Sequence, residues 1–452
     1  MDQTNNIINL IKNKKYFEAK IICQKAIDDI PNSEIFLSLM GNIFLLERNY
    51  EEAKNFFLRG LVVNSENYKL FISLGIANER LNENEEAEKN FLNAINIKPD
   101  LFEGLNNLGF IYNKVKKYDL AIKYLTKCIE VKKDYPEANY NLGFAYYNVK
   151  DYNNAKFYLE QSLKVKHKAK DTNFYLGEIA KFNKNYQEAL KYYVISDHSK
   201  TQIRILEMLA ITNQNDKYLK TIENIIKNDD CDRRVASITP HILQEYKLKN
   251  VYPFCPNPLD FVLKFNLIRE NKIDLSFISN LISEIKKQEF SWEIPMRTTV
   301  KGFTSRGNLS LLNLKNFKHL ENVLLECMFK YKENYKNQNY TFVTSWPKQL
   351  KFHSWSNSLK KEGYNVSHIH PSGWVSGVVY LKVPKDIKKD EAGIEFSLYG
   401  DDFVKNKIPT LTKILKPEVG DLIMFPSSLY HKTIPFNSNE ERMCVAFDLM
   451  PA

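Results

Sequence analysis

Three histidines in the C-terminal part of the chain have the spacing of a reactive site. His368 and His370 stand one residue apart in SHIHPSGWVSGVVYL, which continues directly into an apolar stretch. Because side chains at i and i+2 of a strand point to the same face, both imidazoles can reach one ion. His431 follows in PEVGDLIMFPSSLYHKTIP, where Pro426 and two small serines bend the chain so that this imidazole can also face inward. The three histidines therefore predict a metal site.

An arginine follows the third histidine and predicts an acidic ligand beside that site. Arg442 opens the alternating segment RMCVAFDLM, in which Arg442, Cys444, Ala446 and Asp448 share one face. An arginine on an inward face needs an anionic partner, because a buried unpaired charge is costly. No carboxylate at strand spacing stands out as that partner, whereas a ligand carboxylate held in a bidentate pair would serve.

The surrounding segments must position these side chains. β-Branched and aromatic residues, bounded by polar, proline or glycine turns, predict strands at 340–352, 374–383, 394–399, 421–425 and 442–450. Helices are predicted at 258–272, 274–290 and 320–335. We therefore expect helices packed on a mostly antiparallel, barrel-like β core.

This order of residues resembles that of the 2-oxoglutarate/Fe(II)-dependent oxygenases, whose fold is a double-stranded β-helix. The closer resemblance is to a group of such oxygenases with HxHxxxxxSGVxYL…P, here 368–384, and PxxGDLxxFPSxLxHxxxP…R, here 417–442. The upstream stretches TTVKGFTSRGNL and SWPKQLKFHSW are also similar to that group. The resemblance covers roughly residues 285–452.

The resemblance implies a cofactor, a cosubstrate and residue roles. Fe(II) would be held by His368, His370 and His431, and Arg442 would grip the distal carboxylate of 2-oxoglutarate. The implied reaction consumes O₂ and 2-oxoglutarate, yields succinate and CO₂, and hydroxylates a C–H bond, with ascorbate as reductant in vitro. Tyr380 is expected at the cosubstrate pocket, and Asn365 and Trp374 are candidate substrate contacts. The competing interpretation places the two aromatic residues in the core and Asn365 in a turn.

Two positions depart from the family pattern and leave alternatives open. His370 stands where most of these enzymes have Asp or Glu, and Cys444 stands where Ser or Thr often hydrogen-bonds the same carboxylate. A neutral imidazole at the third place keeps the number of ligands but leaves one more positive charge, so His370 is either a ligand or stands behind a water. The rival functions are a cupin-like metal protein, which would not need Arg442, and a catalytically inactive oxygenase fold on a peptide-binding scaffold.

The first half of the chain is an internal repeat. Glycines recur every 34 residues at Gly41, Gly75, Gly109, Gly143 and Gly177, and alanines keep the same step from Ala19 to Ala189. This pattern resembles the tetratricopeptide repeat (TPR), a pair of antiparallel helices, in which small residues stand where the two helices approach closely. The array predicts a groove that binds a protein or an extended peptide. The alternative is that it only supports the second half or mediates dimerisation.

The whole chain is therefore expected to be multidomain. We predict an all-α TPR solenoid of about six repeats at 1–200, divergent capping or connector helices at 201–280, and a mixed domain with a double-stranded β-helix (jelly-roll) core and flanking helices at 281–452. The substrate stays open among a protein or peptide side chain, a small metabolite and a lipid-linked glycan.

Composition excludes several other classes of protein. The formal charge of +10 comes mostly from lysines scattered among asparagines, so we expect no nucleic-acid partner. The 6 cysteines include no CxxC pair, which favours reduced thiols in a cytoplasmic protein. No stretch approaches the roughly 20 apolar residues of a membrane span.

Overall fold

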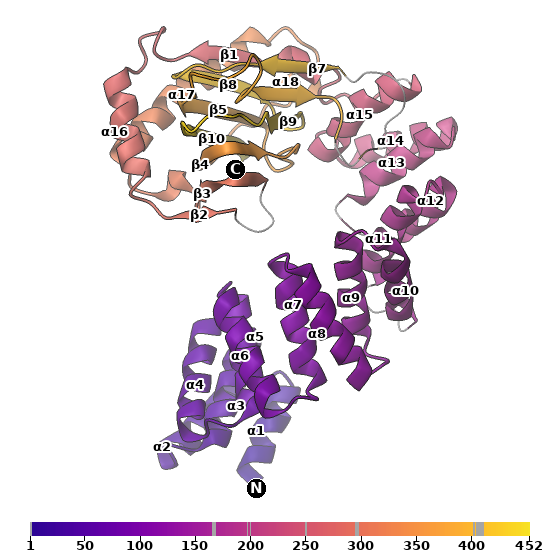
Figure 1. Cartoon of the computed structure of the whole chain (residues 1–452), viewed down its shortest axis with the longest axis vertical. Coiled ribbons are helices and arrows are strands. Elements are labelled where there is room, and N and C mark those ends of the chain that lie inside the picture. The colour runs from indigo at the N-terminus through magenta and orange to yellow at the C-terminus, as the bar shows by residue number, and fades with distance from the viewer. Residues whose placement is uncertain are drawn as a thin grey trace. The chain divides into compact units, whose positions relative to one another are not determined.

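The computed structural model describes residues 2–164, 169–196, 198, 200–248, 251–293, 298–400, 403 and 411–452. The chain divides into two compact units, Met1–His198 and Ser199–Ala452. Figure 1 traces the chain from the indigo helices of the first unit to the yellow strands of the second. Within the described residues, none of the helices has the length and apolar character needed to cross a membrane.

The first unit is a series of antiparallel helix pairs. Its helices are α1 (Asp2–Lys12), α2 (Tyr16–Asp29), α3 (Glu34–Leu46), α4 (Tyr50–Val63), α5 (Tyr68–Arg80), α6 (Asn84–Ile97), α7 (Phe102–Lys114), α8 (Tyr118–Val131), α9 (Pro136–Asn148), α10 (Tyr152–Leu163), α11 (Ala169–Phe182) and α12 (Tyr186–Ile195). The recurring glycines lie in the first helix of a pair and the recurring alanines in the second. The predicted TPR solenoid is confirmed.

Close approach between paired helices explains the glycine at each step. A Cβ atom built at Gly41 would lie 2.5 Å from a ring carbon of Phe57, and one at Gly143 would lie 2.7 Å from Cγ of Leu159. Contacts of that length are closer than carbon atoms tolerate, so the position admits no side chain without movement of the partner. The glycine therefore recurs every 34 residues because each helix pair makes the same close contact.

The second unit begins with three helices and continues into two antiparallel sheets. Its helices are α13 (Thr201–Ile211), α14 (Asn215–Asn228), α15 (Arg233–Tyr246), α16 (Leu275–Ile285), α17 (Lys315–Asn334) and α18 (Thr341–Thr344), with 3₁₀ turns η1 (Pro258–Phe261) and η2 (Leu309–Leu311). Its strands are β1 (Leu263–Asn266), β2 (Phe290–Trp292), β3 (Thr299–Ser305), β4 (Leu350–Asn365), β5 (Val375–Lys382), β6 (Ile394–Ser397), β7 (Thr412–Leu415), β8 (Asp421–Pro426), β9 (Tyr430–Thr433) and β10 (Arg442–Pro451).

The two sheets enclose an apolar core. The larger sheet has the order β1-β8-β5-β10-β4-β3-β2, and the smaller has the order β7-β6-β9. Inner residues such as Val378 on β5, Phe396 on β6 and Phe425 on β8 pack into one buried cluster between the sheets. Burial on this inner face supplies the main stabilisation of such a two-layer core. The predicted β-rich domain with antiparallel sheets and flanking helices is confirmed.

Two predicted elements are wrong. The helix expected over 258–272 is instead η1 followed by β1, which pairs antiparallel with β8 in the register Leu263↔Met424. The backbone of β8 offers an open edge there, and pairing with that edge outweighs local propensity. The strand expected over 340–352 begins only at Leu350. The backbone N–H groups of Thr341 and Phe342 donate to the carbonyls of residues 253 and 254, and these bonds hold Thr341–Thr344 in a helical turn.

Candidate metal centre

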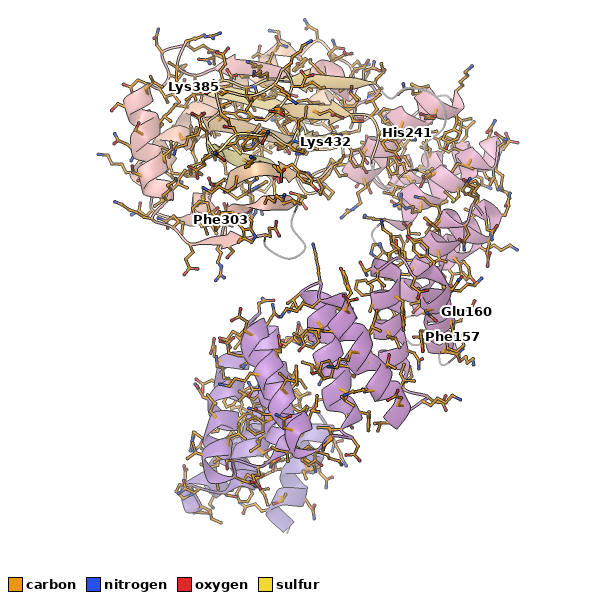
Figure 2. All side chains as sticks on the ribbon, viewed as in Figure 1. Phe157, Glu160, His241, Phe303, Lys385 and Lys432 are labelled. Atoms are coloured by element: carbon orange, nitrogen blue, oxygen red, sulfur yellow. The ribbon has the colours of Figure 1, made fainter. Side chains whose placement is uncertain are left out.

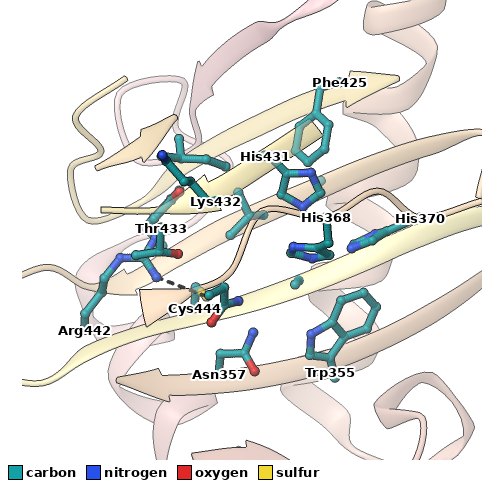
Figure 3. A pocket seen from close by; sticks show the side chains of 16 residues that line it. Trp355, Asn357, His368, His370, Phe425, His431, Lys432, Thr433, Arg442 and Cys444 are labelled. Atoms are coloured by element: carbon teal, nitrogen blue, oxygen red, sulfur yellow. Dashed lines mark hydrogen bonds between the residues drawn. The ribbon is translucent and has the colours of Figure 1, made fainter. Parts of the chain in front are cut away.

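Three histidines from two distant segments of chain meet at one end of the β core. The backbone N–H of His368 donates to the carbonyl of His431 at 3.1 Å, and the N–H of His431 donates back to His368 at 3.1 Å. The N–H of His370 donates to the carbonyl of Ser427 at 2.9 Å. One ring nitrogen from each histidine lies within 4.8 Å of the others. Figure 3 shows the three rings gathered around a common point.

Hydrogen bonds at Nδ1 fix which nitrogen each ring can offer. Nδ1 of His368 lies 2.7 Å from the carbonyl oxygen of Val366, and Nδ1 of His431 lies 3.1 Å from that of Leu429. Nδ1 of His370 lies 2.5 Å from Oδ1 of Asp448. A carbonyl or an ionised carboxylate only accepts, so each Nδ1 carries the proton and each Nε2 keeps its lone pair. This is the arrangement in which imidazoles bind metal ions.

Burial keeps two of these rings neutral. It lowers the pKa of His368 to about 3, with a further contribution from the neighbouring His370. Burial likewise holds the pKa of His431 well below its ordinary value of 6.5. Neutral imidazoles are the form that coordinates a cation, so the pair is prepared to bind near neutral pH.

Asp448 supplies the negative charge that the histidine set lacks. Its position on β10 is opposite Ser376 on β5, and Oγ of Ser376 donates to Oδ1 of Asp448 at 2.6 Å. The hydroxyl groups of Ser376 and Ser427 lie 2.8 Å apart, so a second serine supports the first. A carboxylate behind a metal-binding imidazole fixes its orientation and raises its basicity. The third ligand position itself holds His370 in place of a carboxylate. The carboxylate of Asp448 lies behind that imidazole instead, bonded to its Nδ1.

The loop that carries His370 is also held from the helical side of the same unit. Nε of Arg233, at the start of α15, donates to the carbonyl of Pro371 at 3.0 Å, and Nη1 donates to the carbonyl of Cys231 at 2.7 Å. The guanidinium also lies 5.8 Å from the ring centre of Trp374. The first helical turn of α15 therefore stiffens the segment that follows the histidine pair.

Arg442 lies in a small cavity next to the histidines. It is 2% exposed, its Nε donates to the carbonyl of Ala392 at 3.0 Å, and its guanidinium carbon lies 4.9 Å from the ring centre of Tyr380. Its Nη1 contacts Sγ of Cys444 at 3.8 Å, the dashed line in Figure 3. Within the described part of the chain no carboxylate pairs with it. A buried guanidinium in that state calls for an anionic ligand.

Further polar groups converge on the same small cavity, which the residues around Arg442 and the three histidines line. The hydroxyl of Tyr380 and Oδ1 of Asn365 are buried and make no hydrogen bond to described residues. Burial raises the pKa of Tyr380, which the charge of Arg442 partly opposes, so the phenol stays protonated and can donate. Lys432 also lines the cavity, 3.2 Å from Glu395. Arg442, Tyr380 and Lys432 can donate to a small acid, whereas Oδ1 of Asn365 only accepts.

A larger cavity of about 520 Å³ lies next to the histidine pair. It shares Trp355, Asn357, His368 and His370 with the smaller cavity, and Asp448 adds to its wall. The ring of Trp355 lies 5.4 Å from that of His370. Both cavities therefore border the candidate metal position.

The structure corrects one predicted substrate contact. Trp374 is 3% exposed and lines neither of these two cavities. Its Nε1 donates to the carbonyl of Phe342 at 3.0 Å, and its ring packs on Phe254 at 5.1 Å between ring centres. Its side chain belongs to an aromatic core. Asn365 and Tyr380, by contrast, do line the smaller cavity.

Some residues of the site were not singled out from the sequence. Asp448 and Ser376 were missed as partners of His370, and Trp355 and Asn357 were missed as shared walls of the two cavities. The sequence held one signal, since Asp448 lies on the same strand face as Arg442. What it lacked was the strand register Asp448↔Ser376 and Cys444↔Asn357 that brings these groups to the histidines.

Family models match both parts of the chain. The model described as "Putative 2OG-Fe(II) oxygenase" matches residues 353–448, which include the histidines, Asp448 and Arg442. Two models described as "Tetratricopeptide repeat" match residues 102–135 and 136–167. The family models thus find TPR repeats and an oxygenase-like domain in one chain. This family implies Fe(II) and 2-oxoglutarate, and the three Nε2 atoms, with the cavity around Arg442, fit both.

Solved structures similar to the chain are TPR proteins. The pilF protein of Pseudomonas aeruginosa is 18% identical, with a TM-score of 0.40 over 43% of this chain and 88% of that one. YrrB, described as a TPR protein with an unusual peptide-binding site, is 20% identical, with a TM-score of 0.33 over 37% of this chain and 86% of that one. A TPR protein from Parabacteroides merdae is 12% identical, with a TM-score of 0.40 over 49% and 90%. A search of curated proteins gave no match.

Proposed function

We propose that this protein is a 2-oxoglutarate- and Fe(II)-dependent dioxygenase that hydroxylates a protein or peptide side chain, and that its TPR array recruits the substrate. The overall reaction is R–H + O₂ + 2-oxoglutarate → R–OH + succinate + CO₂. A cytoplasmic location is part of the proposal, since the cysteines in the described residues are all free thiols.

One observation carries the proposal: a set of three histidines with free Nε2 atoms lies beside a buried guanidinium that has no acidic partner among the described residues. The histidines alone would suit many metal proteins, including a cupin-like one. A cupin-like protein would have no acidic ligand for Arg442. A buried guanidinium without such a partner destabilises the folded state. A dicarboxylate that reaches the metal position with one end and Arg442 with the other accounts for both features.

Each group of the site has a definable task. Bound Fe(II) would activate O₂ and accept the 2-oxo acid, which is the chemistry that the protein itself cannot supply. Arg442 binds and orients the distal carboxylate, and the phenol of Tyr380 is placed to donate to the same group. Asp448 holds the proton on Nδ1 of His370 and so keeps Nε2 directed at the metal position. Trp355 shields the site on the side of the larger cavity.

The test is uncoupled 2-oxoglutarate turnover by the full-length protein. Purified protein is supplied with Fe(II), 2-oxoglutarate and ascorbate, and succinate is measured. We expect succinate from the wild type and its loss in His431→Ala. Arg442→Met, which keeps side-chain length without charge, should raise the KM for 2-oxoglutarate by about 30-fold or more, as expected for losing a buried charged pair worth roughly 2 kcal/mol.

A matched control is Lys286→Met, which removes a charge that pairs with Glu441 at 2.8 Å and does not line either cavity. It should turn over 2-oxoglutarate as the wild type does. Equal succinate formation by wild type and His431→Ala would refute the proposed enzymatic function. Metal binding without any dependence on 2-oxoglutarate would favour the cupin-like alternative, and absence of metal binding would favour an inactive oxygenase fold.

A further inference from the structure

A tight turn directly follows His370 and sets the direction of its side chain. The backbone N–H of Gly373 donates to the carbonyl of His370 at 3.0 Å, and the N–H of His370 donates to the carbonyl of Ser427 at 2.9 Å. A Cβ atom built at Gly373 would lie 2.5 Å from Oγ of Ser427, so the turn packs directly against the segment that leads to His431. A small change in this turn would therefore move the His370 imidazole.

Arg233 bonds the middle of that turn, although it lies 138 positions away in the sequence. Its Nε donates to the carbonyl of Pro371 at 3.0 Å, and its Nη1 donates to the carbonyl of Cys231 at 2.7 Å. The ring of Pro371 fixes its φ angle but leaves ψ, which sets the direction of the carbonyl, to be fixed by that bond. Hydrogen bonds from a charged donor are among the stronger ones in proteins, so Arg233 restrains the turn at its least restrained angle.

The helix end that carries Arg233 is itself well fixed. The side chain of Asp232 accepts from the backbone N–H groups of Arg234 at 2.7 Å and Val235 at 3.2 Å, which caps α15. The N–H of Cys231 donates to Oδ1 of Asp229 at 2.8 Å, and Val235 is buried. A donor on a rigid element holds its acceptor more precisely than one on a loose loop. The guanidinium can therefore position the turn rather than follow it.

We propose that Arg233 is a positioning residue of the metal centre, which fixes the carbonyl of Pro371 and so keeps the His370 imidazole between Asp448 and the metal position. Nδ1 of His370 lies 2.5 Å from Oδ1 of Asp448, a bond that a swing of the turn would break. The inference rests on the metal centre of the proposed function and makes that centre dependent on α15, a helix outside the two sheets.

Arg233 should act through one of the three imidazoles only. His368 and His431 hold one another through two backbone bonds of 3.1 Å, and the turn takes no part in these bonds. Loss of the guanidinium should therefore redirect the His370 ring and leave the other two rings in place. A residue that only stabilised the fold would weaken the metal centre whether or not His370 is present.

Co(II) binding to the full-length protein tests the proposal without turnover. Affinity is measured by competition with a chromophoric chelator, and the visible absorption of bound Co(II) reports the geometry of its ligands. We expect Arg233→Met to change that absorption and to weaken binding about tenfold, the lower end of the loss for a partner that orients a metal-binding imidazole. Arg233→Lys keeps a cationic donor and should recover part of the affinity.

The next residue of the same helical turn provides a matched control. Arg234 hydrogen-bonds within the described part of the chain through its backbone alone, including the bonds to Asp232 and Ser237. Arg234→Met, which removes an equal charge one position away, should therefore bind Co(II) with the affinity and the absorption of the wild type.

Combination with His370→Ala separates positioning from general stability. Without the imidazole, Arg233→Met should cost little further affinity, because the group on which it acts is gone. An equal loss in both backgrounds would overturn the proposal, as would an Arg233→Met variant that binds Co(II) like the wild type. Co(II) binding that follows these expectations in a wild type that forms no succinate would support the role of Arg233 and refute the proposed enzymatic function instead.

Discussion

Replacing Asp448 by asparagine tests the central electrostatic feature of the site. Nδ1 of His370 lies 2.5 Å from Oδ1 of Asp448, and Ser376 donates to the same oxygen at 2.6 Å. Asparagine keeps the shape and can still accept from Nδ1, but it removes the negative charge behind the imidazole. The imidazole then becomes a weaker base toward a metal, while the structure of the strand is preserved.

The expected loss can be stated as an affinity. Substitution of a partner that orients a metal-binding imidazole lowers metal affinity by roughly 10- to 100-fold, which corresponds to about 1.4–2.7 kcal/mol. The side chain of Asp448 is only 10% exposed, so solvent screens this interaction little and a value in the upper half of that range is expected. Affinity is measured by competition between the protein and a chromophoric chelator for Co(II) or Fe(II). Glu441→Gln removes an equal charge that bonds Lys286 and Lys382 at 2.8 and 3.0 Å, so it serves as the control.

A second background isolates the action of Asp448 on the imidazole. In His370→Asp the ring that Asp448 orients is gone, so Asp448→Asn should lower metal affinity less in that background than in the wild type. Metal affinity equal to the wild type in the single variant, or an equal loss in both backgrounds, would refute the role assigned to Asp448.

Three other predictions concern stability. Gly143→Val should destabilise the first unit by about 1–3 kcal/mol in denaturant titrations, because a Cβ there would lie 2.7 Å from Leu159 Cγ; an unchanged midpoint would contradict the close helix approach. His241→Leu should stabilise the second unit by about 1 kcal/mol, since both ring nitrogens are buried without a partner in the described residues (His241 is labelled in Figure 2). Burial lowers the pKa of His241 from 6.5 to about 4, so the unfolded chain binds a proton that the folded one does not; stability is full above pH 6.5 and falls toward pH 4. Thermal unfolding at several pH values should show a shallower fall in His241→Leu than in the wild type.

Local periodicity was enough to predict the repeats and the histidine pair. The glycines from Gly41 to Gly177 recur at a fixed step because the same contact between helices recurs. One short sequence pattern therefore predicts the packing of the whole array. His368 and His370 lie on one side of the chain because alternate residues of an extended segment do so. Both inferences depend only on residues close together in sequence.

Contacts between distant strands were beyond the reach of such patterns. Asp448 meets His370 only because β10 pairs with β5 in one register, and a shift of one residue would turn Asp448 to the other face. The β1 segment was predicted as a helix because its pairing with β8 depends on a strand about 160 residues later. Trp374 was expected at the substrate because nothing in its own segment shows that Phe254 and Phe342 enclose it.

The pairing of β1 with β8 sets a practical limit on how the protein can be divided. A recombinant fragment cut at residue 281 would lack β1 and leave the fully buried strand β8 with an open row of backbone donors and acceptors. It would also lose the hydrogen bond from Arg233 to the carbonyl of Pro371. Such a fragment is expected to self-associate through the uncovered strand, whereas one that starts near Ser199 keeps both contacts and is the better choice for crystallisation.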